Sequence, residues 1–150
     1  MTCVRLEDDR IWMRRTGAAS ALILSALLAC SVLAAETGDG GLFSKAQAER
    51  GEALYGQYCA TCHGARLQGN PAAPLTGEAF RSRWEDGQHT LDDLFYIVRS
   101  LMPNNAPGSL TKAQYADVVA YILEVNGYPA GGAELLPDAA AMKAVTLRPH

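Results

Sequence analysis

The stretch Tyr58-Cys59-Ala60-Thr61-Cys62-His63-Gly64 decides how the rest of this 150-residue sequence is interpreted. Its two cysteines are three residues apart, so on one helical turn their thiols face the same side. A histidine follows the second cysteine directly, and the neutral imidazole of histidine is a common metal ligand. Two thiols and an imidazole on one face therefore predict a covalently held group that contains a metal.

The spacing Cys-x-x-Cys-His is the attachment pattern of a c-type haem. Thiols at this spacing can bond to the two vinyl groups along one edge of a porphyrin, and the histidine is then held under the iron. A zinc site would need a second ligand pair, but the sequence has no other Cys-x-x-Cys and no His-x-x-x-His. A thioredoxin-like redox pair would need a preceding strand, whereas a helical pattern precedes this motif. We therefore predict one haem c, attached through Cys59 and Cys62, with His63 as an iron ligand.

The N-terminal part of the chain has the features of an export signal. Residues 17–35 form the one long apolar run, which follows two arginines and ends in small residues. The run is short for a bilayer span, which favours cleavage over anchoring. Acidic residues at 7–9 do not suit an export signal, so we expect translation to start at Met13. The prediction is a signal peptide over residues 1–35 and a periplasmic location.

Cys30 leaves an alternative open, because Leu27-Leu28-Ala29-Cys30 could be a lipoprotein cleavage box. Membrane anchoring is expected only if Cys30 is lipidated; otherwise it is an ordinary cysteine of the signal core. Removal of residues 1–35 takes away four arginines and three acidic residues, so the net charge changes from −3 to −4. No basic cluster suggests a nucleic-acid partner.

The first helix is expected to begin at Ser44. Residues 36–43 are rich in glycine and predict a flexible arm before it. Ser44 and Gln47 have the spacing of a capping box, in which each side chain bonds the backbone of the other residue. Gly51 costs about 1 kcal/mol inside a helix relative to alanine. We expect another helix to cross closely there, with Tyr55 one turn later on the same face.

Two further long helices are expected, opened by Thr90 and Thr111. The first must end before Pro103, and Gly127 suits the C-cap of the second. Residues 64–86 are mostly loop in this interpretation, and no strand pattern of useful length appears. The predicted fold class is all-α, with three main helices and loops wrapped around one haem. The predicted organisation is an arm at 36–43, a domain at 44–128 and a C-terminal tail at 129–150 with a short surface helix within 135–145.

An iron with one histidine ligand needs a sixth ligand or keeps an open site. Met102 follows a helix, and Pro103 restricts its backbone in a loop that can fold over the haem. Met142 suits a gap-filling role, His89 is expected to be solvated, and His150 is the last residue. Met102 is therefore the predicted sixth ligand, which leaves no position for a substrate at the iron.

The sequence resembles the class I cytochromes c of the monohaem bacterial kind over about residues 46–127. The resemblance rests on these motifs: Gly51-x-x-x-Tyr55, Cys59-x-x-Cys62-His63, Pro74, Met102-Pro103 and Ala120-Tyr121-Ile122. It implies that the first and last helices cross at Gly51, with Tyr55 and Tyr121 beside it. It also implies that the carbonyl of Pro74 accepts the proton on the free nitrogen of His63, although the Leu-Thr-Gly after Pro74 is one residue shorter than the mitochondrial form.

Arg81, Arg83 and Trp84 are further candidates for the haem environment. Arginine pairs bidentately with carboxylates such as the haem propionates, and an indole N–H can donate. The alternative is two solvated loop arginines and a core tryptophan.

The expected function is periplasmic transfer of single electrons between redox proteins, without enzymatic activity. Residues 126–135 also resemble cytochromes that serve quinoprotein (PQQ) dehydrogenases, free or fused, which implies a dehydrogenase as donor and an oxidase as acceptor. Two alternatives remain open: a cytochrome subunit of a dehydrogenase complex, or a haem enzyme or gas sensor if Met102 does not bind the iron. The acidic chain argues against docking through a ring of lysines, so contact is expected through apolar surface at the haem edge.

Overall fold

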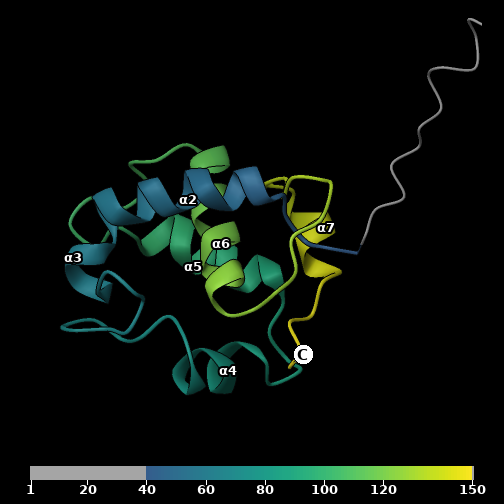
Figure 1. Cartoon of the computed structure of the whole chain (residues 1–150), viewed down its shortest axis with the longest axis horizontal. Helices are drawn as coiled ribbons and strands as arrows, with labels where there is room; N and C mark the ends of the chain where they lie inside the picture. The colour runs from purple at the N-terminus through teal and green to yellow at the C-terminus, as the bar shows by residue number, and fades with distance from the viewer. Residues whose placement is uncertain (1–39, 150) are drawn as a thin grey trace, which may run out of the picture. The chain divides into compact units, whose positions relative to one another are not determined.

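The computed structural model describes residues 40–149 (Figure 1). The predictions for the signal peptide, for Met13 as start, for Cys30 and for His150 lie outside this range. Within it the regular structure is helical, apart from two isolated β-bridges, which confirms the all-α fold class. No helix in residues 40–149 is long and apolar enough to cross a membrane. The helices are α2 (Lys45–Tyr58), α3 (Ala60–His63), α4 (Glu78–Trp84), α5 (Leu91–Leu101), α6 (Lys112–Val125) and α7 (Ala139–Lys143).

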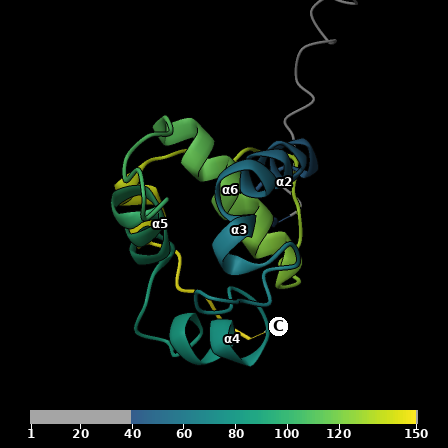
Figure 2. The same ribbon diagram turned by 90° about the vertical axis from the view of Figure 1, so that its left-hand side faces the viewer.

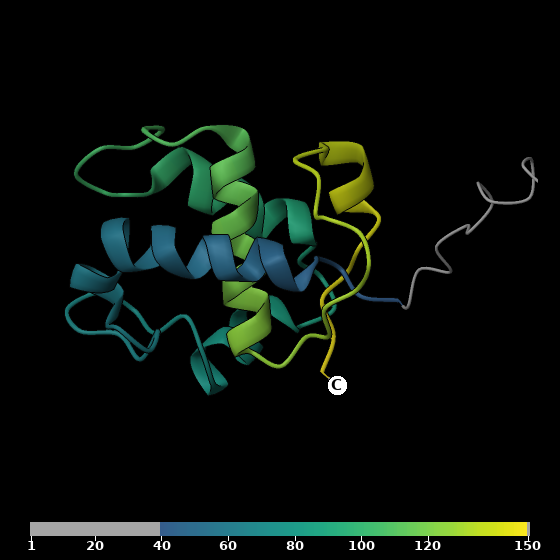
Figure 3. The ribbon, with the colours of Figure 1, turned by 45° about the horizontal axis from the view of Figure 1, so that its top comes forward.

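Helices α2 and α6 cross, as Figure 3 shows for the blue and light-green ribbons. Gly51 lies at the crossing, where a Cβ atom would overlap the carbonyl oxygen of Asp117. One turn later the rings of Tyr55 and Tyr121 pack with their centroids 5.4 Å apart. The predicted close approach at Gly51 is therefore confirmed, and its reason is that only glycine leaves room for the backbone of α6.

The predicted capping motifs are found, with one correction. Thr90 and Thr111 form complete capping boxes with Asp93 and Gln114. Ser44 accepts a hydrogen bond from the backbone of Gln47, but the Gln47 side chain does not return to it. The buried amide of Gln47 instead bonds both backbone groups of Leu135, at 2.9 Å and 2.7 Å. The prediction of a reciprocal box was wrong because a buried amide needs partners, and the C-terminal segment supplies them.

The C-terminal segment also anchors the end of the predicted arm. The carbonyl of Phe43 accepts a 2.6 Å hydrogen bond from Gly131, and the Phe43 side chain is fully buried. Gly41 lies so close to Gly131 that a Cβ atom would overlap it. Residues 41–43 are therefore packed, which corrects the prediction of a flexible arm for these positions. The burial of an aromatic side chain explains the difference, because it removes a large apolar area from water.

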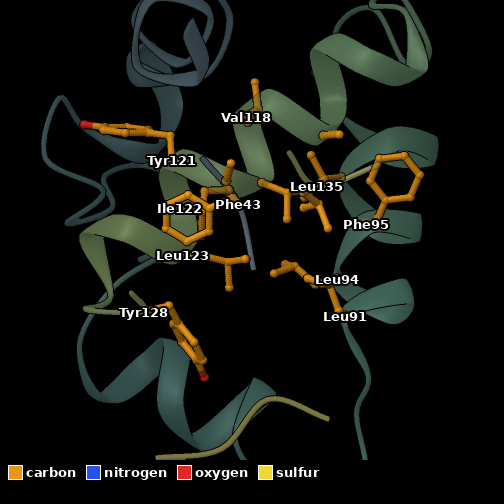
Figure 4. Packing of buried hydrophobic residues seen from close by; sticks show 14 of the residues in the cluster. Phe43, Leu91, Leu94, Phe95, Val118, Tyr121, Ile122, Leu123, Tyr128 and Leu135 are labelled. Atoms are coloured by element: carbon orange, nitrogen blue, oxygen red, sulfur yellow. The ribbon is translucent and has the colours of Figure 1, made fainter. Parts of the chain in front are cut away.

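The apolar core lies between α5 and α6, and the segment after α6 covers one side of it. Figure 4 shows Ile122 and Leu123 of α6 facing Leu91 and Leu94 of α5. Helix α7 lies within the predicted 135–145 segment, and its Met142 is buried in the core, as a gap-filling methionine would be. In Figure 2, α4 lies apart from the crossing helices, beyond the loop that follows α3. These elements surround a large cavity, which contains the predicted site.

Candidate haem site

The cysteine motif lies at the end of α2. Cys59 is the C-cap of α2, and the next four residues form the single turn α3. The amides of Cys62 and His63 both donate to the Cys59 carbonyl, at 3.1 Å and 3.0 Å, so the motif occupies one helical turn as its spacing predicts. Gly64 ends the turn with φ +79°, a value that favours glycine.

One cavity of about 910 Å³ is lined by both predicted attachment cysteines, Cys59 and Cys62, and by both predicted iron ligands, His63 and Met102. This volume lies at the upper end of the range found for small-molecule and cofactor sites. None of the residues that line it is Asp, Glu, Lys or Arg. Its chemically distinctive lining residues are Cys59, Cys62, His63, Trp84 and Met102, and its aliphatic walls come from Leu75, Leu94, Ile97, Val98, Val118 and Ile122.

On one side of the cavity, His63 is oriented by a backbone carbonyl. The Nδ1 atom of His63 lies 2.8 Å from the carbonyl oxygen of Ala73. A proton on Nδ1 would then leave Nε2 as the nitrogen available to a metal. The resemblance assigned this acceptor role to Pro74, so the residue is corrected to Ala73. The shift by one position agrees with the shortened sequence after Pro74, whose exposed ring instead packs against Gly69.

The loop after His63 is tied down at several points, and we call residues 59–77 with Tyr55 and Asn126 the histidine side. The hydroxyl of Tyr55 donates to the Gly64 carbonyl at 2.7 Å, and the side chain of Asn126 donates to the Leu75 carbonyl at 2.9 Å. Three backbone hydrogen bonds close the loop on itself: Gly69 to His63 at 2.7 Å, Ala72 to Cys62 at 2.9 Å, and Leu75 to Leu67 at 2.8 Å. The ring of His63 is therefore held by a rigid frame.

Across the cavity, Met102 is the C-cap of α5, and we call residues 98–115 the methionine side. The Met102 amide donates to the Val98 carbonyl at 3.2 Å. Its carbonyl accepts a 2.7 Å hydrogen bond from the hydroxyl of Tyr115, which is 2% exposed. The sequence analysis did not predict this contact, because Tyr115 lies among apolar residues of the last helix. A hydroxyl on an otherwise apolar stripe was the available signal, because buried tyrosines usually find a hydrogen-bond partner.

The three remaining candidates for the haem environment differ in whether they line the cavity. Trp84 is buried and lines the cavity, and its role in the haem environment stays a prediction. Arg81 and Arg83 are exposed and do not line it: Arg81 bonds Glu78 at 3.3 Å, and Arg83 stacks on the Trp84 ring. The structure therefore does not bring the two arginines into the cavity, because α4 turns them outward while it turns Trp84 inward.

The alternative iron ligands within residues 40–149 lie elsewhere. His89 bonds Asp86 at 2.9 Å and meets the Trp84 ring edge-on, and it does not line the cavity. Met142 lines a separate cavity of about 270 Å³ beside α7. Met102 is thus the one methionine among the residues that line the main cavity.

The donor set fits a haem c. Both cysteines are free thiols, and burial, with the neighbouring Cys62, raises the pKa of Cys59 to about 11. Cys59 is therefore neutral at physiological pH, and the same environment suits the neutral thioether that attachment would form. The imidazole keeps one nitrogen free, a thioether lies across the cavity, and uncharged walls surround both. These features match a flat apolar group with an iron at its centre.

The chain is similar to a family of cytochromes and to individual known proteins. The family model described as cytochrome c oxidase, cbb3-type, subunit III matches residues 46–122. The cbb3-type cytochrome c oxidase subunit CcoP of Rhodobacter capsulatus is 33% identical over 92 residues, which cover 53% of this chain and 31% of that protein. The chain thus spans less than a third of this curated relative. The crystal structure of the sulfane dehydrogenase SoxCD from Paracoccus pantotrophus matches with a TM-score of 0.47 and 21% identity, over 67% of this chain and 52% of that one.

Proposed function

Because the chain belongs to the cytochrome c family described as subunit III of cbb3-type cytochrome c oxidase, we propose that it carries single electrons on one covalent haem c, with His63 and Met102 as axial ligands. The observation that carries the proposal is that both ligands line one cavity together with Cys59 and Cys62. Electron transfer by a cytochrome c domain is the role that the family supports.

When bound, the haem supplies an iron that changes its charge by one electron. The chain's own residues attach it, orient it and exclude water. Cys59 and Cys62 would form the two thioether bonds, and the Ala73 carbonyl would set the direction of the His63 ring. Met102 would fill the sixth position, and a thioether ligand favours the ferrous ion and raises the potential. With His63 and Met102 both bound to it, the iron would have no position left for a substrate, so the chemistry that the bound group would supply is the exchange of single electrons.

The proposed partners are redox proteins of the periplasm. The donor is a dehydrogenase, of the quinoprotein class by the resemblance of residues 126–135, and the acceptor is an oxidase. The curated relative is itself a subunit of an oxidase, which supports the acceptor class. The cavity lining carries no charged side chain, so we propose that docking relies on uncharged surface around the cavity mouth.

A second candidate function is a fixed cytochrome subunit of a larger complex. It is favoured by the chain spanning 31% of a relative that is named as a complex subunit. Purification from the native source under mild conditions separates the two. A free carrier elutes at the mass of one chain, whereas a subunit elutes with the same partner proteins in fixed proportion.

The axial ligation is tested by the absorption spectrum of the ferric protein. The methionine–iron charge-transfer band is expected in the natural protein and in a Met142→Ala control, and it is expected to be absent in Met102→Ala. Absence of the band from the natural protein would contradict the proposal and favour a haem enzyme or gas sensor with an open iron. Mass spectrometry of the denatured protein checks the covalent attachment, which Cys59→Ala should reduce to one bond.

A further inference from the structure

We propose that the hydroxyl group of Tyr115 is the positioning group that keeps Met102 over the cavity. This inference rests on the proposed ligation by Met102 and names the residue that controls how firmly this ligand is held. The contact is a 2.7 Å hydrogen bond from the Tyr115 hydroxyl to the Met102 carbonyl. Because the bond joins the backbone of Met102 to a helix, it restrains the residue without touching its sulfur.

The same hydroxyl oxygen also holds the far end of the loop that follows Met102. It accepts a hydrogen bond from the Leu110 amide at 3.4 Å. Inside the loop the chain makes two turns, with Ala106 donating to Pro103 at 2.8 Å and Ser109 donating to Ala106 at 3.3 Å. Residues 104–109 are exposed. One phenol oxygen therefore closes both ends of an otherwise surface-exposed loop.

Tyr115 itself is firmly placed. It lies in the first turn of α6, directly after the capping box of Thr111 and Gln114. Its ring is 2% exposed, so little water can compete for its hydroxyl. Helix α6 also supplies Val118 and Ile122 to the cavity wall. The hydroxyl thus couples the position of Met102 to the helix against which the haem would lie.

Loss of the hydroxyl should make Met102 easier to displace. Imidazole added to a ferric cytochrome competes with the methionine, and its apparent affinity reports the free energy of moving the methionine away. Tyr115→Phe removes the hydroxyl and retains the ring. A single net hydrogen bond corresponds to an increase of about threefold to tenfold in imidazole affinity.

Tyr128→Phe is the matched control. Tyr128 is also buried, and its hydroxyl makes a hydrogen bond of similar length, 2.8 Å, to the carboxylate of Glu85, but Tyr128 does not line the cavity. A general loss of stability would affect both variants alike. We expect the imidazole affinity of Tyr128→Phe to stay within about twofold of the natural protein.

The outcomes separate this inference from the proposed function. If the natural protein lacks the methionine–iron band, the proposed ligation fails and this inference fails with it. If the band is present and lost in Met102→Ala, but Tyr115→Phe binds imidazole like the natural protein or like Tyr128→Phe, only the inference is overturned. A rise confined to Tyr115→Phe supports it.

A second test uses the natural protein, so it does not depend on whether Tyr115→Phe folds. In the natural protein the amide of Leu110 is expected to exchange its hydrogen more slowly than the amides of Asn104 and Asn105 in the same loop. Equal exchange rates for these three amides would show that the hydroxyl does not hold the loop, and would overturn the inference.

Discussion

The two sides of the cavity hold their proposed iron ligands in different ways. On the histidine side, His63 follows the two cysteines proposed for haem attachment, and its Nδ1 atom and its loop are held by hydrogen bonds from several directions. On the methionine side, Met102 ends a helix, where its amide bonds Val98, and begins an exposed loop whose two ends meet at the hydroxyl of Tyr115. His63 is thus held by a network, whereas Met102 is held by the end of its helix and one side chain.

The difference predicts which side of the cavity opens first. A residue held by many independent contacts moves only if all of them break, whereas one held by fewer contacts moves more readily. We expect the methionine side to open first under heat, denaturant or competing ligands, while His63 stays in place. The hydrogen bonds within residues 40–149 therefore predict that His63 is held more rigidly than Met102.

The largest effect is expected when the group between the two sides is missing. Burial of a haem covers at least twice the area of a large aromatic side chain, so at about 25 cal/mol per Å² it contributes on the order of 10 kcal/mol. This is comparable with the stability of a whole domain. We predict that a Cys59→Ala/Cys62→Ala variant purified without haem does not fold. Calorimetry checks this, and a cooperative thermal transition would refute it.

The next effect concerns the helix that carries the histidine side. Gly51→Ala places a Cβ atom against the Asp117 carbonyl, so α2 and α6 must move apart, at a cost of about 3 kcal/mol. Gly56→Ala is the control in the same helix, since no atom lies within 4 Å of its added Cβ. The free energy of unfolding of Gly56→Ala should rise by up to about 1 kcal/mol, because alanine has a higher helix propensity than glycine. Denaturant titration of both holoproteins measures the difference; similar values would show that the crossing tolerates a side chain.

A smaller effect is expected within the network of the histidine side. Asn126→Ala removes the hydrogen bond to the Leu75 carbonyl and should cost about 1 to 2 kcal/mol. Asn105→Ala, in the exposed loop of the methionine side, should stay within about 0.5 kcal/mol of the natural protein. Imidazole affinity of Asn126→Ala should not change if the two sides are independent. A clear increase would show that the network also supports Met102.

The smallest effect is a pH dependence at the start of α5, the helix that ends at Met102. Hydrogen bonds from the backbone and hydroxyl of Thr90 lower the pKa of Asp93. A lowered pKa stabilises the fold above the unfolded value near 4, and this contribution is lost as the pH falls through the folded value. Asp93→Asn should therefore be slightly less stable than the natural protein at pH 7, by a small amount because the exposed carboxylate is screened by water, and the difference should shrink towards pH 2. A difference that persists at pH 2 would contradict this role.

Much of the fold could be predicted because its signals are local. The cysteine–histidine motif and the caps at Thr90 and Thr111 each depend on residues a few positions apart. The helix crossing could be predicted because it needs a residue without a side chain, and Gly51 is such a residue. The predictions that failed concern partners. Gln47 was assigned to its own helix but pairs with Leu135, eighty-eight positions away. Arg81 and Arg83 are exposed and do not line the cavity, and their pairing with the haem propionates stays a prediction.

The amino-acid sequence by itself determined the main helices and the proposed attachment motif, and it singled out the two residues proposed to bind iron, because helix periodicity and cysteine spacing are properties of short segments. Only the tertiary structure decided that Ala73 rather than Pro74 faces His63, that residues 41–43 are packed, and that Tyr115 holds the Met102 loop. These contacts join positions brought together by burial, where each polar group must find a partner among those that the fold places nearby.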